Sequence, residues 1–279
     1  MTSQPSAAVN QHLLLDNHHR SGIIIPGCYD VLSAQLIEEA GFVAASLSGF
    51  AVSATLGLGD GGQLARSDMI QRTDEVARSV RIPLLVDGDD GYGDATVIGE
   101  TVRQFQEAGA GGLHIDDQWL PRSAGSPKKL ISLEVMQSKI AAATAARTSS
   151  DLAIIGRTDA VSTNGFDEAL RRARALEEAG ADAVMIMYLT EREQVVRAAR
   201  ALSTPLVLAV TETARKSFRA DELAGAGHAA IIYPVSSLLV SLAAQRAVLA
   251  HLAAKGDTEG FLDRMMPMSE VRRLAGGSG

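Results

Sequence analysis

The sequence contains little cysteine, few aromatic residues and no excess of positive charge. Cys28 is the only cysteine in 279 residues, which excludes an intramolecular disulfide and a cysteine-cluster metal site. A single thiol in an apolar context is also more typical of packing than of a nucleophile. The net charge of -7 offers no attraction to nucleic acid or to an anionic membrane surface. We therefore expect neither of these partners.

Long apolar runs are missing as well. No apolar run reaches the roughly 18 residues that a membrane-spanning helix needs. The segment Met1–Asn10 is polar and lacks the charged and apolar regions of a signal peptide. The sequence therefore predicts a cytoplasmic protein without a membrane partner.

Short apolar runs are present, and they alternate with longer helical patterns. The runs cover residues 23–25, 43–47, 84–86, 112–115, 153–155, 183–187, 206–210 and 229–233. Three of the helical stretches end in Glu-Ala-Gly, where glycine is typical of a helix C-cap. Parallel strands joined by helices, in this number, close most economically into an α/β fold of the (β/α)8 TIM barrel type, because right-handed crossovers carry the sheet round on itself. An open doubly wound sheet is the alternative.

The repeat divides the chain into three parts. Residues 21–255 form the predicted barrel domain, and residues 1–20 are expected to form a leading helix or arm. Residues 256–279 form a tail that contains two short apolar pairs, Phe261-Leu262 and Met265-Met266. We expect this tail to dock on a neighbouring subunit, with cover for the side of the barrel as the alternative.

A buried strand that ends in acids predicts a functional site. Residues 84–86 have the length and apolar character of such a strand, and Asp87, Asp89 and Asp90 follow directly. Three carboxylates at one strand end repel one another unless a cation or hydrogen-bond donors lie among them. Oxygen ligands suit Mg²⁺, which keeps several waters and takes one or two carboxylates directly. The alternative is a solvated acidic turn.

Polar residues follow neighbouring strands in the same way. Ser48-Gly49 comes after the second run, Asp116-Asp117-Gln118 after the fourth and Arg157-Thr158-Asp159 after the fifth. Active sites of barrel enzymes lie in the loops at the C-terminal ends of the strands. We therefore expect these residues to meet at one rim.

Seven short motifs occur in one order along the chain. They are Pro26–Ala34, Leu47–Gly49, Leu56–Asp60, Val86–Gly93, His114–Gln118, Ile155–Ala160 and Tyr233–Ser236. With these motifs the chain resembles the isocitrate lyase and phosphoenolpyruvate mutase superfamily over residues 22–254, and within it oxaloacetate decarboxylase-like or carboxyphosphonoenolpyruvate phosphonomutase-like members. The resemblance implies a barrel whose eighth helix is swapped between subunits of a homo-oligomer, either a dimer or a tetramer. It also implies Mg²⁺, with Mn²⁺ as the alternative, which holds a small 2-oxo acid and its enolate.

The resemblance assigns roles to individual residues. Asp87 would bind the metal directly, while Asp89, Asp116 and Asp60 would reach it through water. Asp116 stands where the family usually has glutamate, so its side chain is one methylene shorter. The implied substrate-binding residues are Ser48, Gly49, Phe50, Arg157 and Arg122, and the implied catalytic residues are Arg157, Asp60 and Tyr29. The planar guanidinium of Arg157 suits a carboxylate, and its alternative role is an ion pair within the acidic rim.

The chain departs from the family at several positions to which the resemblance gives a function. In the family's lyases the loop after the fourth strand reads Pro-Lys-Arg-Cys-Gly-His, with the cysteine as general acid or base, whereas residues 121–126 lack the cysteine and the histidine. Met187, Ala209 and an apolar residue near Leu239 replace a glutamate, an asparagine and an arginine. The groups that recognise a large tricarboxylate or protonate its product are therefore absent.

These departures favour decarboxylation of a small 2-oxo dicarboxylate such as oxaloacetate, through an enolate, to pyruvate. This reaction needs no general base to start, and related oxaloacetate decarboxylases also lack the loop cysteine, although the histidine that they carry after the eighth strand is Val235 here. The alternatives are a lyase for another small 2-hydroxy acid, a phosphoenolpyruvate mutase or phosphonopyruvate hydrolase, and a barrel that binds a 2-oxo acid without catalysis. Specificity is expected in residues 119–130, around Met187 and Tyr188, and near Leu238.

Overall fold

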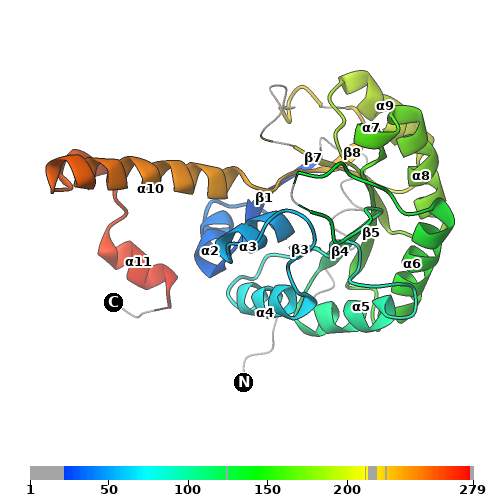
Figure 1. The fold of residues 1–279 in the computed structure, drawn as a ribbon, viewed down its shortest axis with the longest axis horizontal. Helices are drawn as coiled ribbons and strands as arrows, with labels where there is room; N and C mark the ends of the chain where they lie inside the picture. Colours follow the sequence, from blue (N-terminus) through cyan, green and yellow to red (C-terminus); the bar gives the residue numbers. More distant parts are fainter. Residues whose placement is uncertain (1–21, 124, 211, 213–218, 224, 277–279) are drawn as a thin grey trace.

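Parallel strands form a closed barrel in the computed structural model (Figure 1). The structure describes residues 22–123, 125–210, 212, 219–223 and 225–276, so the expected leading arm at residues 1–20 lies outside the described residues. In chain order the strands are β1 (Ile23–Cys28), β2 (Ala45–Leu47), β3 (Leu84–Asp87), β4 (Gly112–Asp116), β5 (Ala153–Thr158), β6 (Ala183–Ile186), β7 (Leu206–Ala209) and β8 (His228–Tyr233). β1 pairs with both β2 and β8, which closes the sheet. The predicted (β/α)8 barrel is confirmed, and the open doubly wound sheet is excluded.

In the described residues, helices follow every strand except β7, and those before α10 surround the barrel (Figure 1). They are α2 (Val31–Glu39), α3 (Gly49–Thr55), α4 (Arg66–Ala77), α5 (Ile98–Glu107), α6 (Leu133–Ala146), α7 (Ala160–Thr163), α8 (Phe166–Glu178), α9 (Arg192–Ala201), α10 (Ser236–Lys255), the 3-10 helix η1 (Glu259–Arg264) and α11 (Met268–Leu274). The Glu-Ala-Gly segments end α2, α5 and α8. Their glycines Gly41, Gly109 and Gly180 have φ angles of 84°, 88° and 97°, a left-handed conformation that glycine adopts without a steric penalty.

Apolar side chains pack in two layers, one inside the barrel and one between the strands and the helices. Leu85 belongs to the inner layer and its neighbour Leu84 to the outer layer. Both faces of the strands are thus buried, which explains why the runs are apolar at successive positions. The helices contribute residues spaced by three or four, such as Ala169, Ala173 and Leu176 on α8. Each fully buried leucine contributes roughly 1.5–3 kcal/mol to stability.

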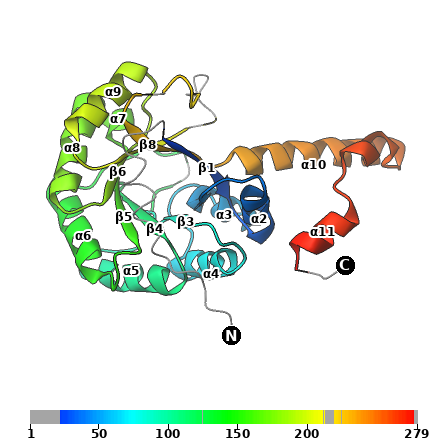
Figure 2. The same cartoon turned by 180° about the vertical axis from the view of Figure 1, so that it is seen from behind.

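α10 departs from this arrangement. It leaves the barrel after β8 and projects away from it; the chain turns back at its far end, and α11 lies below α10 on the side of α2 (Figures 1 and 2). By length and composition α10 is apolar enough to cross a membrane, and only 6% of that stretch is buried. The prediction that no apolar run reaches this length is therefore wrong for α10, because the few polar residues in this stretch, Ser241, Gln245, Arg246 and His251, do not offset its overall hydropathy.

The C-terminal tail contacts its own chain. Arg273 of α11 lies 2.9 Å from Glu39 of α2, and the neighbouring Leu274 is buried. At the end of α10, Nε2 of His251 lies 3.0 Å from Oδ1 of Asp257. Docking of the tail on a neighbouring subunit stays a prediction.

Candidate active site

A cavity of about 310 Å³ lies at the carboxyl ends of the strands. Its lining comprises Ser46, Ser48, Phe50, Asp60, Asp87, Asp89, His114, Asp116, Gln118, Lys128, Arg157, Met185, Met187, Tyr188, Ala209, Val210, Glu212, Ile232, Pro234 and Val235. Most of the predicted site residues are therefore brought together in one pocket. Tyr29, Gly49 and Arg122 are not part of the lining.

Asp87 lies at the end of β3, with two backbone N–H groups and an imidazole beside its carboxylate. Its Oδ2 accepts the backbone N–H of Gly49 at 3.3 Å, its Oδ1 accepts the backbone N–H of Asp89 at 3.2 Å, and Nδ1 of His114 lies 3.4 Å from Oδ1. A Cβ atom at position 49 would lie 3.0 Å from Oδ2 of Asp87, so a larger residue there would displace the carboxylate by a few tenths of an ångström. The carboxylate is positioned before any ligand binds.

Asp89 lies beside Asp116 because the loop after β3 continues the pairing with β4. The backbone N–H of Asp116 donates to the backbone oxygen of Asp89 at 2.8 Å, and Asp89 adopts a left-handed φ of 46°. Burial raises the pKa of Asp116 to about 7. Burial, together with the charges of Asp87 and Asp116, raises the pKa of Asp89 well above its ordinary value. The charge of Arg157 offsets this effect only in part, and a bound cation would stabilise both groups in the charged form.

Asp90, the third acid of the same run, leaves the pocket. Its Oδ2 lies 3.4 Å from Nζ of Lys139 on α6, and its Oδ1 accepts the backbone N–H of Tyr92 at 3.0 Å. Asp90 is not one of the predicted metal ligands, and the buried Lys139 balances its charge.

Arg157 connects the acids of the rim. Its Nε donates to Oδ1 of Asp159 at 3.0 Å, whereas its terminal nitrogens lie 3.9 Å from Asp87 and 3.8 Å from Asp116. Burial alone would lower the pKa of Arg157, but these three carboxylates raise it well above its ordinary value. The two longer contacts exceed hydrogen-bond length, so the N–H groups on that side can still bind a ligand. Arg157 thus pairs within the rim, and substrate binding stays a prediction.

Ser48, Gly49 and Phe50 form the predicted carboxylate-binding turn at the start of α3. The hydroxyl of Ser48 accepts the backbone N–H of Ala51 at 3.3 Å and so caps the helix. Ser48 is buried and Phe50 is exposed, and both line the cavity. The amide of Gly49 donates to Asp87, so in this arrangement it supports the predicted metal ligand.

An ion pair between Asp60 and Arg122 ties the loop after β4 to the loop after α3. Nη2 of Arg122 lies 3.1 Å from Oδ2 of Asp60, and the backbone N–H of Arg122 donates to the backbone oxygen of Gly61 at 2.8 Å. Tyr29 packs against the outer apolar layer, and its backbone oxygen accepts Nη1 of Arg72 at 2.7 Å. The catalytic and binding roles of Asp60, Arg122 and Tyr29 stay predictions.

Comparison with known proteins identifies the family. The family model for phosphoenolpyruvate phosphomutase matches residues 14–253. The chain belongs to the phosphoenolpyruvate phosphomutase family.

This family member is 36% identical over 260 residues to 2-methylisocitrate lyase from Aeropyrum pernix, a match that covers 92% of this chain and 84% of the relative. It is 34% identical over 259 residues to an oxaloacetate decarboxylase from Bradyrhizobium sp. (strain BTAi1), which covers 90% of each chain. Its fold matches the structure of a phosphonopyruvate hydrolase in complex with oxalate and Mg²⁺, with a TM-score of 0.87, 30% identity and coverage of 98% and 95%. The predicted membership of the isocitrate lyase and phosphoenolpyruvate mutase superfamily is confirmed, and with it the prediction of a lyase.

Several pocket residues of this phosphoenolpyruvate phosphomutase family member have no predicted role. His114 and Gln118 belong to a motif at the end of the fourth strand, so their position was a usable signal. Burial lowers the pKa of His114 although Asp87 opposes this effect. Lys128 also lines the cavity and lies within residues 119–130, where specificity is expected, whereas Glu212 lies in the loop after β7, to which no role was assigned.

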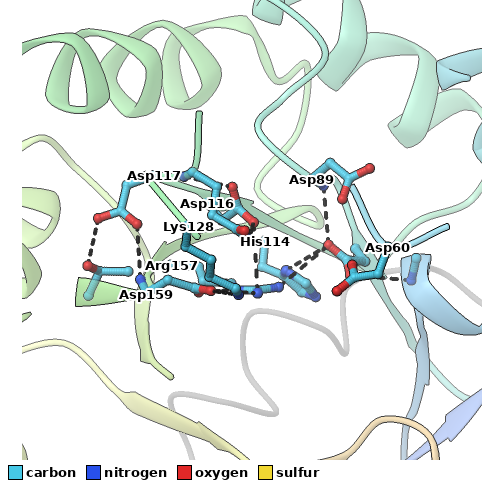
Figure 3. A network of polar contacts seen from close by, with 12 residues as sticks. Asp60, Asp89, His114, Asp116, Asp117, Lys128, Arg157 and Asp159 are labelled. Carbon is cyan, nitrogen blue, oxygen red and sulfur yellow. Dashed lines mark hydrogen bonds and ion pairs between the residues drawn. The ribbon is translucent and has the colours of Figure 1, made fainter. Parts of the chain in front are cut away.

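Asp117 connects the end of β5 to α8 beneath the pocket through three hydrogen bonds. Its side chain accepts the hydroxyl of Thr158 at 2.6 Å, the backbone N–H of Asp159 at 3.0 Å and Nη1 of Arg172 at 3.1 Å. Figure 3 shows Asp117 beside Asp159. Asp117 is completely buried, and it thereby fixes the residue that orients Arg157.

The acids of this family member fit a hydrated divalent cation. Within the described ranges, no three histidine, cysteine or carboxylate side chains are close enough to form a ready-made metal cage. Mg²⁺ does not need one, because it keeps several waters and takes only one or two carboxylates directly. Asp87 as the direct ligand, with Asp89 and Asp116 reaching the ion through water, meets this requirement. The raised pKa values of Asp89 and Asp116 are those of carboxyl groups that a cation would stabilise in the charged form.

Proposed function

We propose that the protein is a Mg²⁺-dependent carbon-carbon lyase for a small 2-oxo or 2-hydroxy dicarboxylate, with decarboxylation of oxaloacetate to pyruvate as the leading reaction. The observation that carries this proposal is a single cavity lined by Asp87, Asp89 and Asp116, in which the guanidinium of Arg157 lies 3.9 Å from Asp87 and 3.8 Å from Asp116. The similarity to an oxaloacetate decarboxylase supports the same reaction.

Arg157 would bind the carboxylate beside the 2-oxo group of the substrate. Its open N–H groups can donate two parallel hydrogen bonds, and Asp159 fixes the other edge of the guanidinium. Asp87, Asp89 and Asp116 would hold Mg²⁺ or Mn²⁺. When bound, the ion supplies positive charge that stabilises the enolate formed when the carbon-carbon bond breaks.

The rest of the cavity favours a small substrate. Met185, Met187, Ala209, Ile232 and Val235 contribute apolar wall, and the volume lies near the lower end of the roughly 300–1,000 Å³ range of ligand pockets. These apolar side chains offer no hydrogen bond or ion pair to the additional carboxylates of a larger substrate. A carboxylate that leaves as carbon dioxide loses its charge, so apolar surroundings favour that step.

Two further functions remain as outcomes of the same test. Phosphorus-carbon chemistry, of the phosphoenolpyruvate mutase or phosphonopyruvate hydrolase type, has support from the similarity to a phosphonopyruvate hydrolase. The other is binding of a 2-oxo acid without catalysis. The absence of the lyase loop's cysteine and histidine from residues 121–126 favours this function.

The test is a panel of substrates assayed with Mg²⁺ for pyruvate release: oxaloacetate, 2,3-dimethylmalate, 2-methylisocitrate and phosphonopyruvate. Because oxaloacetate also decarboxylates with free metal ions, the matched background is the same assay with Asp87→Ala. Faster pyruvate release from oxaloacetate with the unmodified protein supports the proposal. Turnover of phosphonopyruvate alone favours phosphorus-carbon chemistry, and no turnover at all favours the binding protein.

We also propose a cytoplasmic homo-oligomer in which α10 packs on a second copy of the chain. The support is the exposure of its apolar side chains, with Val240 70% and Leu249 61% exposed. Substituting both residues by Asp should lower the mass measured by light scattering to that of a monomer. An unchanged mass, or a monomer before substitution, would contradict this assembly.

A further inference from the structure

We propose that the hydroxyl of Tyr188 is the proton donor that converts the enolate into product, and that Lys128 positions it. This inference rests on the proposed function, because it names the proton source for the same pocket. A source is needed because residues 121–126 contain neither the cysteine nor the histidine of the family's lyase loop.

Tyr188 is held in an unusual backbone conformation at the edge of the cavity. It follows β6 with a φ of 64°, which bulky residues rarely adopt. Such conformations cost free energy and persist where the surrounding structure enforces them, often at functional sites. Here the backbone N–H of Met187 donates to Thr158 at 3.0 Å, and Tyr188 packs against the inner apolar layer. Tyr188 therefore lines the same cavity as Asp87 and Arg157.

Lys128 determines whether the hydroxyl oxygen of Tyr188 accepts or donates in the hydrogen bond between them. Nζ of Lys128 lies 2.6 Å from the Tyr188 oxygen and also contacts Oδ2 of Asp159. Burial alone would lower the pKa of Lys128, but Asp159 and Tyr188 raise it, so the amine stays protonated at neutral pH. A protonated lysine can only donate hydrogen bonds. The Tyr188 oxygen is thus the acceptor, which leaves the phenolic proton for another acceptor.

A continuous set of contacts joins this hydroxyl to the proposed carboxylate-binding group. Arg157 contacts Asp159, Asp159 contacts Lys128, and Lys128 contacts Tyr188. Figure 3 shows Arg157, Asp159 and Lys128 lying next to one another along the rim. A substrate held by Arg157 would therefore lie in the same cavity as the donor.

The other titratable groups of the lining have different partners. His114 faces Asp87, and Asp60 pairs with Arg122. Glu212 accepts the backbone N–H of Val235 at 3.0 Å and the hydroxyl of Ser236 at 2.7 Å, so it anchors the start of α10. Among the described lining residues, Tyr188 combines a free hydroxyl proton with a neighbouring cation.

The proton balance of the step is simple. Loss of carbon dioxide leaves the electron pair of the broken carbon-carbon bond on the enolate. The Tyr188 O–H bond then breaks, its proton forms the new C–H bond of the pyruvate methyl group, and the phenolate is stabilised by Lys128. Water entering the pocket returns a proton to the phenolate.

The test measures proton transfer separately from bond cleavage. Pyruvate is incubated with the protein and Mg²⁺ in D₂O, and proton NMR follows exchange of its methyl hydrogens, while cleavage of oxaloacetate is assayed in parallel. Tyr188→Phe should slow exchange by about 100-fold or more, since a positioned acid contributes 10²–10⁴-fold. The matched control is Tyr92→Phe, which removes a buried hydroxyl from another tyrosine with positive φ, 58°, outside the cavity lining; it should exchange at the unmodified rate. Oxalate affinity by calorimetry checks that each variant retains its pocket.

Lys128 is tested by rescue. Lys128→Met should lose exchange like Tyr188→Phe, whereas Lys128→Arg, which keeps a cationic donor, should retain a substantial part of it. Unmodified exchange in Tyr188→Phe, or cleavage by the unmodified protein without any exchange, would overturn this inference and leave the proposed function intact. Exchange without cleavage of any panel substrate would overturn the proposed reaction and leave Tyr188 as the donor. The absence of both activities would overturn both.

Discussion

Asp87 and His114 face each other across the parallel pairing of β3 and β4, and Oδ1 of Asp87 lies 3.4 Å from Nδ1 of His114. Burial lowers the pKa of His114 against the opposing effect of Asp87, so the imidazole is neutral at neutral pH. A neutral imidazole lies beside the carboxylate without cancelling its charge. The proposed direct metal ligand therefore keeps that charge for a cation.

Asp87→Ala should abolish Mg²⁺ binding and catalysis while the barrel stays folded, because the residue ends a strand at the rim and is not part of the apolar layers. Titration calorimetry measures the metal affinity, and circular dichroism checks the fold. The control is Asp74→Ala on α4, whose ion pair with Arg78 is exposed. Unchanged Mg²⁺ affinity in Asp87→Ala would remove this residue from the metal site.

Oxalate, a planar mimic of the pyruvate enolate, should bind more tightly than pyruvate in the presence of Mg²⁺. An enzyme's site complements the charge that develops during cleavage, whereas a binding protein has no such requirement. In Arg157→Ala the binding free energy of oxalate should become less favourable by roughly 2–5 kcal/mol, because a charge-assisted contact is lost. Equal affinities for the two ligands, measured by calorimetry, would favour the binding-only function.

The protein should not cleave 2-methylisocitrate or isocitrate above background, because residues 121–126 lack the loop acid and Met187 lies in the cavity where the family's lyases carry glutamate. The measurement is release of succinate, pyruvate or glyoxylate with Mg²⁺ present. Rapid release from either compound would contradict the proposed decarboxylation of a small substrate.

Arg172→Met should destabilise the fold by roughly 3–5 kcal/mol, because it leaves the buried charge of Asp117 without its cation. Urea unfolding measures the loss. The control is the adjacent Arg171→Met, which removes an exposed ion pair with Glu168 and should have little effect. Similar losses in the two variants would show that the buried pair has no special role.

His228 should make stability depend on pH. Burial lowers its pKa below the ordinary value of 6.5, so the unfolded chain binds a proton at a higher pH than the folded chain. This contribution is fully present above about pH 6.5 and is lost as the pH falls through the lowered pKa. The free energy of unfolding is measured in urea at pH 8 and at pH 5. Its decrease from pH 8 to pH 5 should be smaller in His228→Asn than in the unmodified protein. An equal fall would refute the assignment.

The strands and the acids at their ends were predictable because they are local properties of the chain. Continuous apolar runs such as residues 84–86 reflect burial on both faces, and Glu-Ala-Gly marks helix ends at Gly41 and Gly109 by backbone conformation alone. In a parallel barrel the carboxyl ends of all strands share one rim. Asp87 and Arg157 could therefore be placed in one site without coordinates.

Only the tertiary structure decided which side chains meet across that rim. Asp90 belongs to the same acidic run as Asp87, yet it pairs with Lys139, and Lys128 meets Tyr188 across 60 residues of sequence. Spacing along the chain cannot show such pairs, because they depend on loop paths and on the closure of the barrel. The chain by itself thus determined the barrel and its acidic rim, while the partners of each charge followed from distances that exist only in the folded molecule.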